Sequence, residues 1–116
     1  MIRYTTPAIP LLVEGKDLTQ GQEIYVSMEQ GPKDFPTAAL EKRDSDLTIS
    51  TETHGQITDT SITFTLTQEE SAMFNLNQSV EIQVNWINAS GVREATEIKR
   101  IPVMRNLLDR VIAYGD

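Results

Sequence analysis

The sequence predicts an all-β fold, an antiparallel β-sandwich, from one long hairpin and from the spacing of short strands around it. In the hairpin segment Ser79 to Val103, apolar and polar side chains first alternate strictly, which is the period of a strand with one buried face. The apolar members are Val80, Ile82, Val84 and Trp86. The turn-forming stretch 88–91 (Asn-Ala-Ser-Gly) follows, and residues 92–103 are expected to return as the second strand. Six to eight short strands with a turn about every dozen residues are typical of a sandwich or a small barrel.

The opening third of the chain supplies two of these strands. Residues 8–13 form an apolar run, and Pro10 within it restricts the run to the edge of a sheet. A loop is expected over residues 15–21. Residues 23–30 alternate cleanly and predict a strand, which a breaker containing glycine and prolines at 31–36 ends.

The middle of the chain carries weaker signals. We expect short strands over residues 37–42 and 47–51, on either side of a polar turn at 43–46. Residues 38–42 have good helix propensity, but five residues are too few to form a helix alone. A further turn is expected at residues 54–56, which read His-Gly-Gln.

A short helix is expected to join the two sheets. Residues 61–67 alternate between apolar and hydroxyl side chains, which favours a strand. Thr67 and Glu70 then have the spacing of a capping box, and they predict one or two helical turns over residues 68–74. One helical turn between two sheets suits an immunoglobulin-like sandwich. The predicted fold class is therefore all-β, an immunoglobulin-like antiparallel β-sandwich with one short helix.

The return strand of the hairpin is expected to be irregular. Its apolar residues are Ala95, Ile98, Ile101 and Val103. They occupy both odd and even positions, so a regular strand would not place them on one face. A β-bulge near residues 97–100 would place them on one face. Pro102 indicates an edge position or the end of the strand.

The last residues form an apolar tail. We divide the chain into a β-sandwich domain over residues 1–105 and a C-terminal apolar tail over residues 106–116. The candidate interface residues in the tail are Leu107, Leu108, Val111 and Ile112. Apolar side chains beyond the last strand either pack on their own sheet or dock on a neighbouring molecule, and the sequence leaves both alternatives open.

Composition excludes several functional classes. The 116 residues include 17 acidic and 10 basic ones, for a net charge of −7, so no nucleic-acid partner is expected. The absence of cysteine excludes disulfides and thiolate metal sites. No apolar run approaches the ~20 residues of a membrane span, and the N-terminal sequence lacks the pattern of a signal peptide. We therefore expect a soluble protein that is kept inside a cell.

No catalytic arrangement stands out in the sequence. His54 is the single histidine, and its polar surroundings beside Gly55 indicate a surface turn. Asp44 and Asp46 have carboxylates at a spacing that suits calcium, but the other ligands and the glycine of a dedicated loop are missing. Phosphate-binding and nucleophile-elbow motifs are absent as well. The sequence predicts no catalytic, metal-binding or cofactor-binding residue and disfavours a small hydrolase.

Trp86 has two interpretations. It shares a face with the apolar residues of its strand and is most simply a core residue. Alternatively, it forms a sugar-stacking platform together with Tyr25 or Tyr4, as in carbohydrate-binding modules. Aromatic residues make up only 6% of the chain, which favours the core interpretation.

Three segments carry a resemblance to phage proteins. They are Ile2-Arg3-Tyr4-Thr5-Thr6-Pro7-Ala8, Leu66-Thr67-Gln68-Glu69-Glu70 and Val80-Glu81-Ile82-Gln83-Val84-Asn85-Trp86. The chain resembles small proteins encoded in phages and prophages of Gram-positive gut bacteria. More loosely, it is similar to the immunoglobulin-like N-terminal domain of phage baseplate upper proteins. In both groups a Leu-Thr-Gln-Glu stretch precedes a strand, a turn and a strand with Ala-x-x-Ile, here Ala95-Thr96-Glu97-Ile98. Unlike the baseplate proteins, the sequence ends at Asp116 without a receptor-binding or coiled-coil extension.

The resemblance implies a non-enzymatic structural or assembly protein of a phage or prophage, in the tail, baseplate or virion, that acts through protein–protein contacts. Expected partners are further copies of the chain, as a symmetric homo-oligomer, or other virion proteins, with no membrane or cofactor. Edge strands at 8–13 and 92–103 are expected to pair with neighbouring chains. The expected location is the cytoplasm of the bacterial host during assembly, and then the virion. The alternative function is a carbohydrate-binding module for adhesion to host cell walls.

Overall fold

The computed structural model describes residues 1–20, 22–31, 38–76 and 78–113. Within these residues the chain forms eight strands, one α-helix and two 3-10 turns. In order, these are β1 (Ala8–Val13), a 3-10 turn (Leu18–Gln20), β2 (Gln22–Gln30), β3 (Ala38–Arg43), a second 3-10 turn (Asp44–Asp46), β4 (Thr48–His54), β5 (Ile57–Thr65), α1 (Gln68–Ala72), β6 (Val80–Ile87), β7 (Arg93–Ala95) and β8 (Lys99–Ile101).

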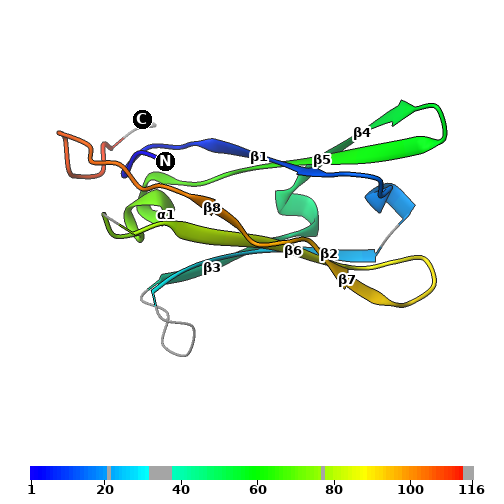
Figure 1. Cartoon of the computed structure of the whole chain (residues 1–116). Coiled ribbons are helices and arrows are strands. Elements are labelled where there is room, and N and C mark those ends of the chain that lie inside the picture. The colour runs from blue at the N-terminus through cyan, green and yellow to red at the C-terminus, as the bar shows by residue number, and fades with distance from the viewer. Residues whose placement is uncertain (21, 32–37, 77, 114–116) are drawn as a thin grey trace.

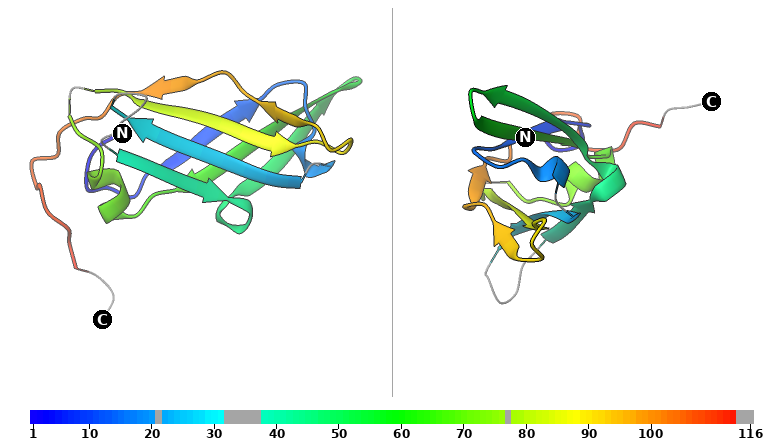
Figure 2. Two further views of the ribbon diagram at one scale, coloured as in Figure 1. Left: turned by 90° about the horizontal axis from the view of Figure 1, so that it is seen from below. Right: turned by 90° about the vertical axis from the view of Figure 1, so that its right-hand side faces the viewer.

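Two sheets lie face to face, as Figure 1 shows from the side and Figure 2 (right) from one end. The strand order is β1-β5-β4 in the first sheet and β3-β2-β6 in the second, where β7 and β8 both pair with β6. All of these strand pairs are antiparallel. The predicted all-β antiparallel sandwich with one short helix is therefore confirmed, whereas its immunoglobulin-like character stays a prediction. β1 lies at a sheet edge, as Pro10 indicated.

The alternation that predicted the strands also places the core, because every second side chain of the long strands points between the sheets. β6 alternates buried and half-buried side chains along its whole length. The core side chains with almost no exposure include Val26, Met28, Ile62, Phe64, Phe74, Val80, Ile82 and Val84. Burying one such side chain contributes about 1.5–3 kcal/mol, so these facing rows hold the two sheets together.

The return side of the β6 hairpin is irregular, as predicted, but the irregularity does not place the apolar residues on one buried face, because Ala95 and Ile98 are exposed whereas Val103 is buried. The register of the hairpin is Asn85↔Ala95 toward the turn and Ile82↔Lys99 toward the other end, so the return side has one residue more between these pairs. Thr96 spans the irregularity, because its N–H donates to the Val84 carbonyl at 2.9 Å and its Oγ1 accepts the Val84 N–H at 3.1 Å. A side chain thus replaces a missing ladder acceptor. β8 ends directly before Pro102, as expected.

The chain changes sheets at the predicted polar turn. β3 belongs to the second sheet and β4 to the first, so the prediction of two short strands rather than a helix is confirmed. In the turn, Asp46 Oδ2 accepts the Arg43 N–H at 3.2 Å. The turn expected at residues 54–56 joins β4 to β5, and Gly55 has a φ of +65°, which favours glycine. Predicted features at Gly21 and at residues 32–37 lie outside the described residues.

A one-turn helix carries the chain from β5 to β6, and its start is the predicted capping box. The Thr67 N–H donates to Glu70 Oε1 at 2.9 Å, and Thr67 Oγ1 accepts the Glu70 N–H at 3.1 Å. Lys42 of β3 donates to both Glu70 oxygens at 2.9 Å, which ties the helix to the second sheet. This helix, the α-helix of the described residues, is far too short and polar to traverse a bilayer.

The segment after α1 is fixed by a buried polar residue, Gln30, whose side chain is 1% exposed. Its Nε2 donates to the carbonyl oxygens of Asn75 and Gln78 at 2.8 and 3.1 Å, and its Oε1 accepts the Asn75 N–H at 2.6 Å. One amide therefore supplies hydrogen bonds that the backbone lacks as it leaves the helix and enters β6.

We predict that Glu70→Ala lowers the free energy of unfolding by about 1–2 kcal/mol at neutral pH, because it removes half of the capping box and the partner of Lys42. Partial burial raises the pKa of Glu70, but hydrogen bonds from Thr67 and Lys42 and the charge of Lys42 outweigh it and lower the pKa. The ionised carboxylate therefore stabilises the fold fully above the unfolded pKa of about 4.3, and this contribution is lost as the pH falls through the folded value.

Urea denaturation at neutral and acidic pH measures both effects. Glu69→Ala, in the same helical turn but exposed, is the matched control. Equal losses in the two variants, or a loss for Glu70→Ala that persists unchanged in acid, would contradict the prediction.

Candidate functional site

The apolar tail leaves the sandwich after Val103, the side chain of which is still buried. In Figure 2 (left) the tail runs past α1 and away from the sheets, coloured orange to red. Its candidate interface side chains are exposed, Leu107 by 87%, Leu108 by 42%, Val111 by 39% and Ile112 by 51%. In the described part of the chain none of the four belongs to the core between the sheets.

The tail is nevertheless held in place through its backbone. Gln68, a buried side chain of α1, donates from Nε2 to the Ile112 carbonyl at 2.9 Å and accepts the Ile112 N–H on Oε1 at 2.7 Å. Asn106 Nδ2 donates to the Arg3 carbonyl at 3.0 Å. These contacts satisfy polar groups of the tail while its apolar side chains remain in solvent.

Arg3 joins the three segments that meet at this end. Its Nη2 donates to the Ala72 carbonyl at the end of α1 (2.9 Å), and its Nη1 pairs with Asp109 of the tail at 3.2 Å. The guanidinium also lies over the Tyr4 ring, 5.2 Å from its centre. The first residues are fixed as well, because Met104 N–H donates to the Met1 carbonyl and Ile2 bridges Met104.

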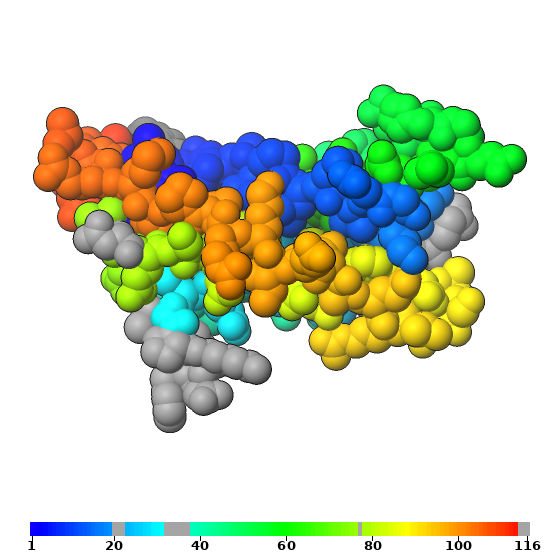
Figure 3. Space-filling view, viewed as in Figure 1, coloured from blue at the N-terminus to red at the C-terminus, as the bar shows by residue number. Residues whose placement is uncertain are grey.

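We define the terminal apolar cluster as the exposed apolar side chains on these joined segments. They are Ile2, Met73, Met104, Leu107, Leu108, Val111 and Ile112. Figure 3 shows the tail beside the blue N-terminal residues at one end of the molecule. Scattered exposed apolar side chains are ordinary on a protein surface, but a gathering of them is typical of an interaction site.

Trp86 is a core residue, as its strand position predicted. Its side chain is 4% exposed and therefore offers no ring face for stacking on a sugar. Its Nε1 donates to Glu94 Oε1 at 3.2 Å. Hydrogen bonds from Lys16 and Asn88 to the same carboxylate lower the pKa of Glu94, so the group that holds the indole stays ionised at neutral pH.

The other candidate residues lie apart from one another. His54 ends β4 at the tip of the β4–β5 hairpin, where its Nε2 is 3.5 Å from Glu52, and Asp44 pairs with Arg43 at 2.9 Å. Within residues 1–20, 22–31, 38–76 and 78–113, histidine and carboxylate side chains do not gather in any group of three or more that could hold a metal ion.

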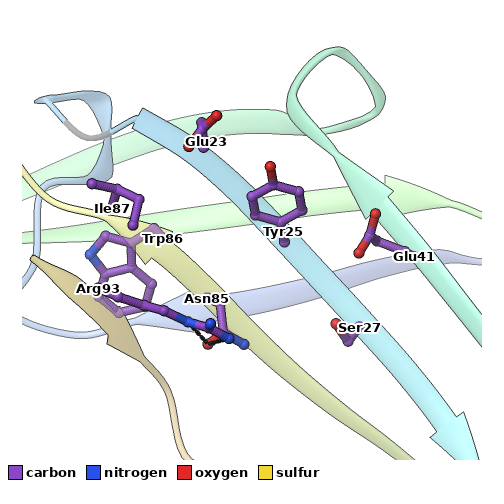
Figure 4. Close-up of a pocket in the computed structure, with 8 residues that line it drawn as sticks. All are labelled: Glu23, Tyr25, Ser27, Glu41, Asn85, Trp86, Ile87 and Arg93. Carbon is purple, nitrogen blue, oxygen red and sulfur yellow. Dashed lines mark hydrogen bonds between the residues drawn. The ribbon is translucent and has the colours of Figure 1, made fainter. Parts of the chain in front are cut away.

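A second candidate site is a cavity of about 350 Å³ on the outer face of the second sheet (Figure 4). It is lined by Glu23, Tyr25, Ser27, Glu41, Asn85, Trp86, Ile87 and Arg93. Tyr25 stands in its middle, between side chains from the neighbouring strands β3 and β6. Arg93 donates from Nε and Nη2 to Asn85 Oδ1 at 3.3 and 3.2 Å.

Sequence reasoning did not find this cavity. The alternation of β2 already places Tyr25 and Ser27 on its outer face, but their neighbours come from strands far apart in the sequence. The pairings Tyr25↔Arg43, Tyr25↔Asn85 and Ser27↔Glu41 become known only with the register. Comparison with protein-family models, with curated proteins and with solved structures gives no match for this chain.

We predict that Gln68→Leu releases the tail while the sandwich stays folded. Leucine has a similar size but cannot bond the Ile112 backbone, so the Ile112 N–H should exchange with solvent many times faster. Amide hydrogen exchange measured by NMR checks this at single residues. Gln83→Leu is the matched control, because Gln83 bonds the Thr96 carbonyl at 2.9 Å in the distant bulge. Unchanged exchange at Ile112 in Gln68→Leu would show that the two hydrogen bonds do not hold the tail.

Proposed function

We propose that this chain is a non-enzymatic structural or assembly protein of a phage or prophage, acting through protein–protein contacts in a tail, baseplate or virion. The observation that carries the proposal is the terminal apolar cluster. Apolar side chains there are exposed on segments that are joined by hydrogen bonds, from side chains to backbone and between the backbones of residues 1–3 and Met104. A partner that covers them would remove this apolar surface from water, which is favourable in proportion to the area buried.

The tail is already held in place before any partner binds, which favours binding. A flexible apolar tail would lose conformational freedom on binding, and that loss would offset much of the gain from burial. Here hydrogen bonds that involve Gln68, Arg3 and Asn106 already hold the tail against the sandwich. The surface is thus presented in a form that a partner can bind with a smaller entropic cost.

The proposal of a phage or prophage protein rests on three sequence segments that resemble such proteins. Residues 2–8 precede and begin β1, residues 66–70 contain the capping box, and residues 80–86 lie in β6. The first two are in contact, because the Leu66 N–H donates to the Pro7 carbonyl at 3.1 Å.

The proposed partners are further copies of the chain or other virion proteins. Self-association through one end would give a symmetric oligomer, since the same surface serves both molecules. β1 and the β7–β8 side of the second sheet are edges at which additional strands could pair. Assembly would take place in the cytoplasm of the bacterial host, before incorporation into the virion.

We predict that the full chain forms an oligomer of constant mass above the 13.0 kDa of one chain, and that replacing the tail's apolar side chains abolishes it. The variant combines Leu107→Ser, Leu108→Ser, Val111→Ser and Ile112→Ser. It is preferable to deleting residues 106–116, because deletion also leaves the buried Gln68 amide without its Ile112 partner. Light scattering over a range of concentrations measures the mass.

The matched control combines Leu12→Ser and Ile57→Ser, two exposed apolar side chains on the first sheet and away from the cluster. The control should keep the oligomer. A strictly monomeric parent chain would rule out self-association, and an oligomer that survives in the tail variant would show that the contact lies elsewhere.

A further inference from the structure

The cavity on the second sheet has a clear structural origin. Tyr25 is central on β2 and is in register with Arg43 of β3 and Asn85 of β6. Two positions further along β2, the small side chain of Ser27 lies beside Glu41. A large ring next to a small hydroxyl, with long side chains on the neighbouring strands, leaves a hollow rather than a level surface.

A β-bulge in β2 lies at Glu23, one of the residues that line the cavity. The register of β2 against β6 shifts between Gln22 and Tyr25, and Glu23 within the shift has a φ of +50°. This left-handed conformation is unfavourable for a residue with a side chain, and Glu23 lines the cavity on the same face of β2 as Tyr25 and Ser27. Backbone irregularities of this kind are enriched beside binding sites.

The hydrogen-bonding groups in the cavity are complementary to hydroxyl groups. Among the described residues, Glu23 and Glu41 have no hydrogen-bond donor, and the Asn85 amide nitrogen has no acceptor. Asn85 Oδ1 instead holds Arg93, which orients both planar groups. Carboxylates accept hydrogen bonds from adjacent hydroxyls, and the amide and guanidinium groups donate to hydroxyl oxygens.

Charge and shape narrow the class of ligand. Two carboxylates, Glu23 and Glu41, and one guanidinium, Arg93, line the cavity, so it holds charges of both signs. Arg43 lies 4.5 Å from the centre of the Tyr25 ring, but its charge is paired with Asp44 at 2.9 Å. An anion would meet the two carboxylates, and a cation would meet the Arg93 guanidinium. Tyr25 lines the cavity, whereas Arg43, which lies over its ring, is not among the lining residues. The C–H face of a sugar ring packs well on such an aromatic surface.

We propose that this cavity binds a neutral carbohydrate, with Tyr25 as the platform and Glu23, Glu41 and Asn85 as the hydroxyl-binding groups. Its volume of about 350 Å³ is near the lower end of the range for small-molecule sites and is suited to a mono- or disaccharide unit. The site is independent of the terminal apolar cluster and of the proposed assembly function. It also differs from a platform built on Trp86, which is buried.

The test is a titration of the full chain, observed by amide NMR, with four neutral disaccharides: maltose, cellobiose, lactose and diacetylchitobiose. Saturable shifts at Tyr25, Ser27 and Asn85 are expected for at least one of them. Tyr25→Ala and Glu41→Gln should each weaken that binding tenfold or more. Glu41→Gln is a nearly isosteric change at an exposed position of an edge strand, so it keeps the fold if Tyr25→Ala does not.

Tyr4→Ala is the matched control, because Tyr4 also lies under an arginine but at the other end of the molecule. It should bind the sugar as the parent chain does. Absence of saturable shifts with all four disaccharides would overturn the proposal. So would equal binding by Glu41→Gln, or binding of inorganic phosphate or choline in this cavity in preference to the sugars.

Discussion

The structure depends on how the chain crosses from the first sheet to the second between β5 and β6. This crossing places backbone N–H and C=O groups next to the core, where groups without hydrogen-bond partners are costly. One turn of helix cannot satisfy them alone, since the first N–H groups and last C=O groups of any helix lack partners within it. Side chains from elsewhere complete the set: Lys42 through Glu70, and Gln30 through the Asn75 backbone. Two strands of the second sheet therefore fix the point at which β6 begins.

The same helix organises the end of the molecule that carries the terminal apolar cluster. Arg3 bonds the Ala72 carbonyl, Ser71 bonds the Thr5 carbonyl, and Gln68 bonds the Ile112 backbone. Each contact uses a polar group to position a segment that has no sheet partner of its own beyond the short bridge at Ile2. A change that melts this helix would consequently remove these three contacts from the terminal segments.

The sequence predicts what depends on local pattern. Alternation identified β6 and its buried face, and the Thr67–Glu70 spacing identified the helix start. The mixed odd and even positions of the apolar residues indicated an irregular return strand, but not that Ala95 and Ile98 would be exposed. Gln30 and Gln68 escaped this reasoning, since a buried glutamine looks like a surface residue until the backbone that it bonds is known. The cavity escaped for a related reason. Tyr25, Glu41 and Asn85 become neighbours only through cross-strand register, which the pattern of each single strand does not contain.

The two proposed surfaces lie at opposite ends of β6. Val80 begins this strand beside α1 and the tail, whereas Asn85 and Ile87 line the cavity near the hairpin turn. β6 lies between β2 on one side and β7 and β8 on the other, and its buried face is fully packed. It therefore acts as a rigid spacer, since packed strands deform little. Molecules joined through the tail end would each direct the Tyr25 cavity away from the contact. A sandwich of this kind can support assembly at one end and leave a binding face accessible at the other, because the groups that build each surface come from different elements.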